Sequence, residues 1–284
     1  MRSLYNVYII CTSIKSSPQT DFAKLYEAAF NPTHSHSTRN MVPSITLIRH
    51  AESTSNSTQS SDILDPPLTP HGQSQCETLS KTLASSKSHR RLVVSSPLQR
   101  TLQTALLSLP WPRPVIALPD LQELSARPCD TGRSLQVLMA QFGSGEVDFR
   151  AMQPDWEKKQ GRYRATPQAC EERARAAREW LRNADADEVV VVAHGGLLRY
   201  LTEDWEGCEE GDEWANAEVR KFEFGAQGSA LVETAKSRGQ RGLVGARLDR
   251  TQQVVLRRSM EARWKAHLVE KGYVVDSEWK SAAL

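Results

Sequence analysis

The sequence has no long hydrophobic run, few cysteines and almost no net charge. Since no apolar run approaches the roughly 18 residues that cross a bilayer, we expect no membrane-spanning helix. The five cysteines are odd in number, widely spaced and without a CxxC pair, which is typical of a reducing compartment and argues against a zinc site. A formal net charge of +2 is too small to indicate nucleic-acid binding. We therefore expect a cytoplasmic protein without nucleic-acid or membrane partners.

The composition is that of an ordinary soluble globular protein. With 284 residues, of which 39% are hydrophobic and 25% charged, the chain fits one large domain with an insertion and tails. Residues 1–43 differ from the rest, because they combine a possible helix over Asp21–Phe30 with a polar His/Ser/Thr stretch. They also lack the small-residue cleavage site of a secretory signal. We interpret 1–43 as a poorly ordered leader and 44–284 as the folded domain.

The domain is organised around the stretch ITLIRHAESTSN, residues Ile45–Asn56. Its apolar and β-branched beginning predicts a buried strand, which ends at Arg49 and His50. In open α/β sheets, ligands bind beyond the carboxyl ends of the strands. We therefore expect chemistry at this strand end, although an Arg-His pair alone is more typical of a solvated surface.

Three further predicted strands are each followed by a polar side chain suited to a site. The strands and the residues that follow them are Leu92–Val94 with Arg100, Val115–Leu118 with Glu123, and Val189–Ala193 with His194. Arg100 also falls in the first turn of a helix that we expect to open at Pro97, where free backbone N–H groups favour an anion. Four consecutive valines before His194 predict a central parallel strand that is buried on both faces.

The remaining segments predict the layers around this sheet. The strand pattern disappears between Leu124 and Asn183, and we interpret 124–183 as an insertion that packs over the site. Two more strands are predicted at Ala217–Phe224 and Ala230–Glu233, and a C-terminal amphipathic helix at 252–271. The inner side of that helix is predicted to consist of Leu256, Met260, Trp264 and Leu268. The fold class is thus an α/β three-layer sandwich with a mainly parallel central sheet, helices on both faces and an inserted helical and loop cap.

The polar residues at the four strand ends suit a phosphoryl group. Guanidinium groups bind phosphoryl oxygens through paired hydrogen bonds, and an imidazole can attack phosphorus to form a phosphohistidine. A carboxylate is a poor phosphate ligand, so Glu123 makes sense as a proton donor and acceptor. A helix-capping role for Glu123 is the structural alternative, and Asp120 or Glu213 are alternative proton donors.

Five motifs together resemble the histidine phosphatase (phosphoglycerate mutase-like) superfamily, over about Ser44 to Phe224. They are LIRHAESTSN, which resembles the family's RHG signature, then DPPLTPHG, VVSSPLQRTLQTA, LQEL and VVVVAHGG. LQELSARPCDTG and NAEVRKFEF look most like the fungal branch. The resemblance implies no metal and no cofactor. It also implies that His50 is the phosphorylated nucleophile and that Glu123 is the general acid and base. The residues implied to bind the phosphoryl oxygens are Arg49, Arg100, His194 and Asn56.

The resemblance favours a phosphatase of a small phosphorylated metabolite. A phosphoglycerate mutase is the alternative, but the ERHYG-type segment of that branch is replaced here by LQELSARP. A pseudo-phosphatase that only binds phosphate is supported by Ala51 alone, which stands where the family has glycine and is expected to strain the backbone or narrow the pocket. We expect 124–183 and the C-terminal segment to set the substrate, while the sequence is silent on its identity and on oligomeric state.

Overall fold

The computed structural model describes residues 42–273 with short gaps at 85–87, 89, 110–113, 144, 209–213, 226–227, 229 and 244, together with Val275 and Trp279. These residues belong to one compact unit, residues 39–284. The predicted leader, 1–43, falls almost entirely outside the described residues. In the described part of the chain, no helix is both long and apolar enough to cross a membrane.

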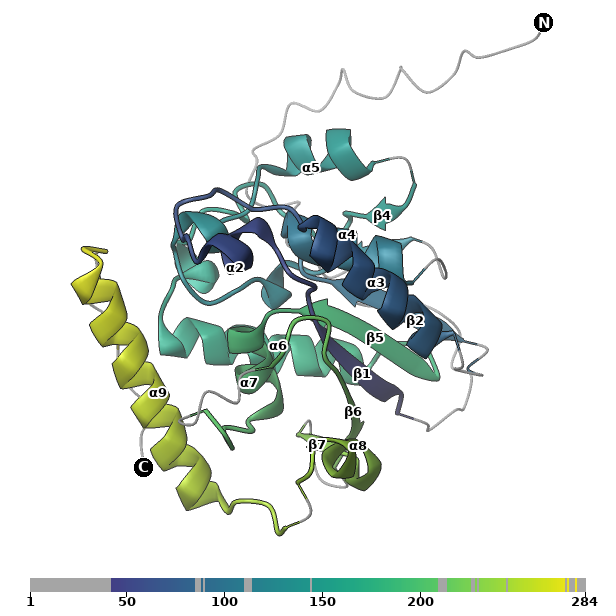
Figure 1. Ribbon diagram of the computed structural model, residues 1–284, viewed down its shortest axis with the longest axis vertical. Helices are drawn as coiled ribbons and strands as arrows, with labels where there is room; N and C mark the ends of the chain where they lie inside the picture. Colours follow the sequence, from purple (N-terminus) through teal and green to yellow (C-terminus); the bar gives the residue numbers. More distant parts are fainter. Residues whose placement is uncertain are drawn as a thin grey trace, which may run out of the picture. The chain divides into compact units, whose positions relative to one another are not determined.

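A seven-stranded sheet forms the centre of the domain, in the order β4-β3-β2-β5-β1-β6-β7 (Figure 1). The strands are β1 (Ser44–Arg49), β2 (Arg91–Ser95), β3 (Val115–Ala117), β4 (Val147–Asp148), β5 (Glu188–Ala193), β6 (Val219–Phe224) and β7 (Leu231–Glu233). The first five in spatial order pair in parallel, whereas β6 and β7 are antiparallel. The predicted mainly parallel sheet is confirmed, and the carboxyl ends of β1, β2 and β5 meet at one edge.

The valines of β5 are buried on both faces of the sheet, as predicted. Val190 and Val192 pack with residues of α3 and α4, while Val189 and Val191 pack with residues of α6 and α7. The covering helices are α3 (Pro70–Leu83), α4 (Gln99–Ser108), α6 (Pro167–Arg182) and α7 (Gly195–Thr202). Helices on both faces of one sheet make the predicted three-layer sandwich, and Figure 1 shows the sheet between them.

Local sequence signals explain where α3 and α4, the two helices that cover one face of the sheet, begin. Thr69 caps α3 by accepting a hydrogen bond from the N–H of Gly72 at 2.9 Å, and Pro70 occupies the first helical position. The next helix, α4, begins at Gln99 and not at Pro97, the position predicted from the sequence. The buried carboxylate of Asp65 accepts from the N–H of Gln99 at 2.8 Å, which provides the cap.

The predicted insertion, 124–183, divides into two parts. Its first part contains the short elements η2 (Pro128–Asp130), α5 (Leu135–Phe142), β4 and η3 (Gly161–Tyr163), which follow η1 (Pro119–Leu121). Leu138 and Trp156 from this part pack on Leu98 and Leu102 at α4. Helix α6 instead belongs to the main core. The prediction of a single cap without strands is therefore wrong for α6 and for β4, a strand of only two residues.

Two arginines of the highly charged helix α6 are buried. Arg173 donates to the backbone oxygens of Asp120 at 3.2 Å and Gln122 at 2.7 Å. Arg178 donates to the backbone oxygen of Tyr200 at 2.8 Å and pairs with Glu203. These contacts satisfy carbonyl groups at the ends of neighbouring elements, so both arginines have structural roles.

The C-terminal part contains α8 (Ala235–Gln240) and the long helix α9 (Arg250–Glu270). Asp249 caps α9 by accepting from the N–H of Gln252 at 2.9 Å. Leu256, Met260 and Trp264 pack against the main core, and Leu268 is buried. The predicted inner side of this helix is confirmed.

Candidate active site

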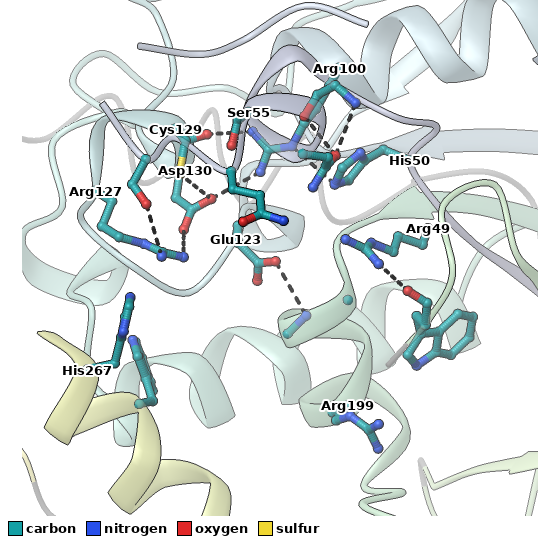
Figure 2. Close-up of a pocket in the computed structure, with 18 of the residues that line it drawn as sticks. Arg49, His50, Ser55, Arg100, Glu123, Arg127, Cys129, Asp130, Arg199 and His267 are labelled. Atoms are coloured by element: carbon teal, nitrogen blue, oxygen red, sulfur yellow. Dashed lines mark hydrogen bonds and ion pairs between the residues drawn. The ribbon is translucent and has the colours of Figure 1, made fainter. Parts of the chain in front are cut away.

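A cavity of about 600 Å³ opens at the carboxyl ends of the central strands (Figure 2). Five of the six predicted site residues line it, namely Arg49, His50, Asn56, Arg100 and Glu123. The sixth, His194, is fully buried and is not among the described residues that line the cavity. Its ring centroid lies 5.2 Å from that of His50. Residues from four separate strand ends therefore meet, as the sheet predicts.

The side chain of His50 is held in one orientation by its own backbone neighbour. Nδ1 of His50 lies 2.8 Å from the carbonyl oxygen of Ala51, which can only accept a hydrogen bond. Nδ1 must therefore carry the proton, and Nε2 keeps its lone pair in the neutral ring. Nε of Arg100 donates to this Nε2 atom at 3.2 Å. The geometry leaves Nε2 as the nucleophilic atom of His50.

Both buried histidines are held in the neutral form. Burial lowers the pKa of His50 well below its ordinary value of 6.5, and the positive charges of Arg100 and Arg49 lower it further. Burial and Arg100 likewise lower the pKa of His194. Nε2 of His194 lies 2.8 Å from the hydroxyl of Ser96. Among the described residues, none forms a hydrogen bond to its Nδ1 atom.

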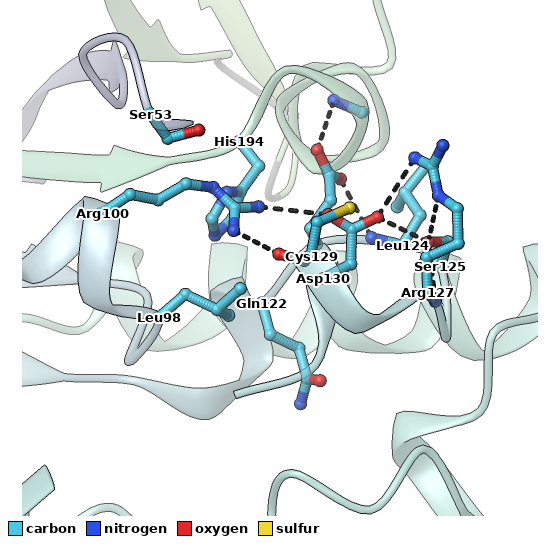
Figure 3. Close-up of polar contacts among 12 residues, drawn as sticks. Ser53, Leu98, Arg100, Gln122, Leu124, Ser125, Arg127, Cys129, Asp130 and His194 are labelled. Atoms are coloured by element: carbon cyan, nitrogen blue, oxygen red, sulfur yellow. Dashed lines mark hydrogen bonds and ion pairs between the residues drawn. The ribbon is translucent and has the colours of Figure 1, made fainter. Parts of the chain in front are cut away.

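Arg100 is fixed by a buried network on the cap side of the site (Figure 3). Its guanidinium donates to the backbone oxygen of Cys129 and to the carboxylate of Asp130, the latter at 3.1 Å. Arg127 pairs with the other oxygen of Asp130 at 3.3 Å, and the Ser125 hydroxyl donates to that oxygen as well. Although burial raises the pKa of Asp130, the two arginines lower it overall, so the carboxylate stays ionised.

Glu123 caps a helix and also lines the cavity. One carboxylate oxygen accepts from the N–H of Leu197 at 3.1 Å and the other from the N–H of Gly196 at 3.3 Å, so Glu123 caps α7. It also lines the cavity, and burial together with the charge of Asp130 raises its pKa. The pKa of Glu123 is raised and that of its neighbour Asp130 is lowered. Such a divergence is typical of a pair in which one carboxyl group holds a proton and the other stays an anion.

Asp120, one of the two alternative proton donors, does not line the described cavity. Asp120 pairs with Arg162 at 2.6 Å and is not among the lining residues. Glu213 lies outside the described residues. Of the carboxyl groups on the lining, only Glu123 combines a raised pKa with a place beside His50 and Arg100.

Arg49 and Asn56 complete the lining next to His50. Arg49 donates to the backbone oxygen of Trp214. Oδ1 of Asn56 accepts from the N–H of Ser53 at 3.0 Å, which caps the short helix α2 (Thr54–Thr58). The Nδ2 group of Asn56 would therefore have to make any contact with an anion. The side chain of Asn216 donates to the backbone oxygen of His50 at 3.0 Å and so links the segment before β6 to the end of β1.

Ala51 fits its site without the expected strain. Its φ angle is not among the positive values found at five of the described non-glycine residues. The methyl group is buried in a small apolar cluster with Leu68 and Cys76, and the backbone N–H donates to the hydroxyl of Thr104 at 3.0 Å. The side chain therefore points into the core, and the residue meets His50 only through its carbonyl group.

Comparison with known proteins agrees with this geometry. Residues 45–236 match the family described as the histidine phosphatase superfamily (branch 1). The chain belongs to the histidine phosphatase superfamily. The chain is 30% identical over 196 residues to the phosphoglycerate mutase-like protein 1 of Arabidopsis thaliana. The match covers 54% of this chain and 68% of the Arabidopsis protein. Assignment to the fungal branch stays a prediction.

Comparison with solved structures gives matches at lower identity. A putative alpha-ribazole-5'-P phosphatase from Escherichia coli is 21% identical, with a TM-score of 0.48 over 68% of this chain and 95% of that one. A phosphoserine phosphatase from Entamoeba histolytica, in complex with 3-phosphoglyceric acid, is 19% identical, with a TM-score of 0.45 over 68% and 95% of the two chains.

Sequence reasoning missed several residues of this histidine phosphatase site. Cys129 and Asp130, within the PCDTG stretch, line the cavity although neither was among the predicted site residues. The contact between Arg100 and Asp130 joins α4 to the cap, and no local spacing in the sequence predicts such a contact. Two arginines of unrelated segments, Arg127 and Arg263, also line the cavity.

Proposed function

We propose that this protein is a metal-independent phosphatase, which hydrolyses a small phosphorylated metabolite through a phosphohistidine on His50. The observation that carries the proposal is the contact of Nδ1 of His50 with the Ala51 carbonyl, which turns the lone pair of Nε2 toward Arg100 and the cavity. A buried, neutral imidazole with a fixed tautomer is ready to act as a nucleophile.

The reaction would proceed in two displacements at phosphorus. Nε2 of His50 forms a bond to phosphorus while the bond to the ester oxygen breaks, and protonated Glu123 gives its proton to the leaving alcohol. A water molecule then attacks the phosphohistidine and loses its proton to the Glu123 carboxylate. Inorganic phosphate leaves, and both side chains return to their starting states. The raised pKa of Glu123 supports its first role.

The surrounding cations would stabilise the transferred phosphoryl group. Arg100 already contacts Nε2 of His50, so it lies beside the atom to which phosphorus would bind. Arg49 lines the same end of the cavity, and the amide of Asn56 would add a hydrogen bond to a phosphoryl oxygen. His194, which lies behind His50, would act from a second layer through its Nδ1 atom, which has no hydrogen-bond partner among the described residues. Fixed charges in a buried site bind a developing anion without reorganisation.

A rapid-quench experiment tests this mechanism. The protein is mixed with ³²P-labelled phenyl phosphate, and acid-labile, base-stable label on the protein is measured together with free phosphate. We expect both in the wild type and neither in His50→Ala, with turnover unchanged by a metal chelator. Failure of the wild type across a broad panel of phosphate esters would support the binding-only alternative, a pseudo-phosphatase.

Mutase activity is the second candidate, because the curated relative from Arabidopsis thaliana is named a phosphoglycerate mutase-like protein. A mutase would return the phosphoryl group from His50 to a second hydroxyl instead of water. Incubation with 3-phosphoglycerate and a trace of the bisphosphate separates the two. We expect free phosphate to appear, whereas accumulation of 2-phosphoglycerate would favour the mutase.

A further inference from the structure

Helix α9 supplies one wall of the cavity. Its contribution consists of four residues at the i, i+3, i+4 and i+7 positions of one face, namely Met260, Arg263, Trp264 and His267. Met260 and Trp264 also pack against the main core, and the Trp264 ring contacts that of Trp279 at 4.5 Å between centroids. Beyond the helix, the hydroxyl of Tyr273 donates to Asp62 at 3.4 Å. These contacts fix the helix as a wall of the pocket.

The α9 wall carries a guanidinium group, Arg263, and an imidazole, His267, that are separate from the groups around His50. Figure 2 shows His267 on the same side of the cavity as Arg127, at the end away from His50. Arg263, one turn before His267, donates to the backbone oxygen of Cys208 at 2.7 Å and to the hydroxyl of Ser259 at 3.1 Å. A guanidinium that backbone contacts already hold loses little conformational entropy when it binds an anion.

A phosphoryl group alone does not account for this arrangement. A cavity of about 600 Å³ lies in the size range of sites that take a whole small molecule. Five of the described lining residues are arginines, namely Arg49, Arg100, Arg127, Arg199 and Arg263, and two are carboxylic acids. One of these acids, Glu123, has a raised pKa that favours its neutral form. A phosphate dianion bound at His50 would not balance the positive charge of the described lining residues, of which Arg263 lies on α9.

We propose that the substrate is a phosphomonoester with a second anionic group, either a carboxylate or another phosphate, and that Arg263 and His267 bind this second group. The inference rests on the proposed phosphatase function and adds the substrate class to it. The Met260 and Trp264 side chains, which lie on the same helix face, would contact the apolar body of the substrate. Arg263 and His267 are thereby specificity-determining residues, whereas the chemistry stays with His50.

Three esters on one ring test this proposal. The values of kcat/KM are measured for phenyl phosphate, 3-carboxyphenyl phosphate and benzene-1,3-diyl bisphosphate. We expect the wild type to prefer at least one of the two doubly anionic esters by about tenfold or more, as charge-assisted hydrogen bonds allow. That preference should fall about fivefold or more in Arg263→Gln and nearly vanish in the Arg263→Gln, His267→Gln double variant. Whichever anionic ester is preferred identifies the second group.

Lys265→Gln is the matched control, since it removes one positive charge from an exposed position on the same helix that is not part of the cavity lining. Its preference should equal that of the wild type. Equal use of all three esters by the wild type, or a preference that survives in the double variant, overturns the proposal. If no ester is hydrolysed, the phosphatase function fails instead. Calorimetric binding of the same three esters to the wild type and Arg263→Gln then still decides whether α9 recognises the second anion.

Discussion

Arg100 donates a hydrogen bond from its Nε atom to Nε2 of His50 at 3.2 Å. The same guanidinium is held on its other side by Asp130 and the carbonyl of Cys129, so a single side chain connects the β1 strand end with the cap. This contact keeps a proton off the nucleophilic nitrogen, because a second positive charge beside Arg100 is unfavourable. It also places a cation where a phosphoryl group on His50 would carry its negative charge.

Replacement of Arg100 by lysine should reduce kcat by roughly 100-fold or more. Lysine keeps the charge but loses the planar fork that contacts His50, Cys129 and Asp130 at once, and loss of two charge-assisted hydrogen bonds of about 1.5–3 kcal/mol each has an effect of this size. The measurement is steady-state hydrolysis of phenyl phosphate. Arg90→Lys, at a half-exposed pair with Asp185, is the control and should retain activity. Retained activity in Arg100→Lys would contradict a direct role in the site.

Activity should persist on the acid side of neutrality. His50 is active in its neutral form, and its lowered pKa means that this form survives below the ordinary histidine pKa of 6.5. Glu123 is active first in its protonated form, and its raised pKa extends that form above the ordinary glutamate pKa of 4.5. A profile of kcat/KM between about pH 4 and 9, which reports the free enzyme, should therefore show its acid limb below 6.5. An acid limb at or above 6.5 would mean that His50 is not held neutral.

Glu123→Gln separates proton donation from helix capping. Glutamine has an oxygen that can still cap α7 but no proton to give to a leaving alcohol. A poor leaving group needs that proton, whereas p-nitrophenolate does not. We expect kcat to fall about 100-fold or more for phenyl phosphate and much less for p-nitrophenyl phosphate, with the alkaline limb of the pH profile lost. Equal losses for both esters would indicate that Glu123 acts only by capping.

The sequence predicted those parts of the site that depend on the central sheet. Four valines can be buried on both faces only in a central strand, and the parallel order then brings Arg49, Arg100 and Glu123 to one edge. The position of His194 at its strand end followed from the same pattern. The hydrophobic pattern does not tell how far a side chain lies from the cavity surface. It therefore did not predict that His194 lies behind His50 instead of on the cavity wall.

Contacts between distant segments could not be predicted in this way. Asp130 reaches Arg100 because the cap folds back over α4, and Arg263 reaches the cavity because α9 crosses its rim. Both contacts depend on how irregular segments pack. The hydrophobic periods of about two residues for strands and about 3.6 residues for helices do not determine the path of such segments. The insertion prediction failed at α6 for a related reason. The apolar stripe of this helix, which includes Ala174 and Ala177, packs in the main core, and the sequence pattern does not tell which layer such a stripe will contact.

Substitution of Ala51 by glycine should leave activity nearly unchanged and lower stability. The methyl group is buried among Leu68 and Cys76, and its removal together with greater backbone freedom in the unfolded chain should destabilise the fold by about 1–2 kcal/mol. The backbone carbonyl that holds His50 is kept, so kcat should stay within about threefold. Chemical denaturation and phenyl phosphate turnover measure the two effects. A large gain of activity would show that alanine at this position weakens the site.

Adjacent glycines at the start of α7 give a sharper test of how Glu123 is positioned. A Cβ atom at Gly196 would lie 2.7 Å from a carboxylate oxygen of Glu123 and 2.7 Å from Cδ1 of Leu124, so one of them must move. At Gly195 the nearest atoms belong to Arg49 at 3.6 Å, an ordinary van der Waals contact. Both positions are helical, where alanine is favoured over glycine by about 1 kcal/mol.

Gly196→Ala should therefore lose about tenfold or more in kcat for phenyl phosphate, while Gly195→Ala stays within about threefold and is no less stable. The Gly196→Ala loss should be small for p-nitrophenyl phosphate, because displacement of Glu123 removes the proton donor and not the nucleophile. Similar losses in the two variants, or for the two esters, would mean that the position of the Glu123 carboxyl group does not limit the reaction.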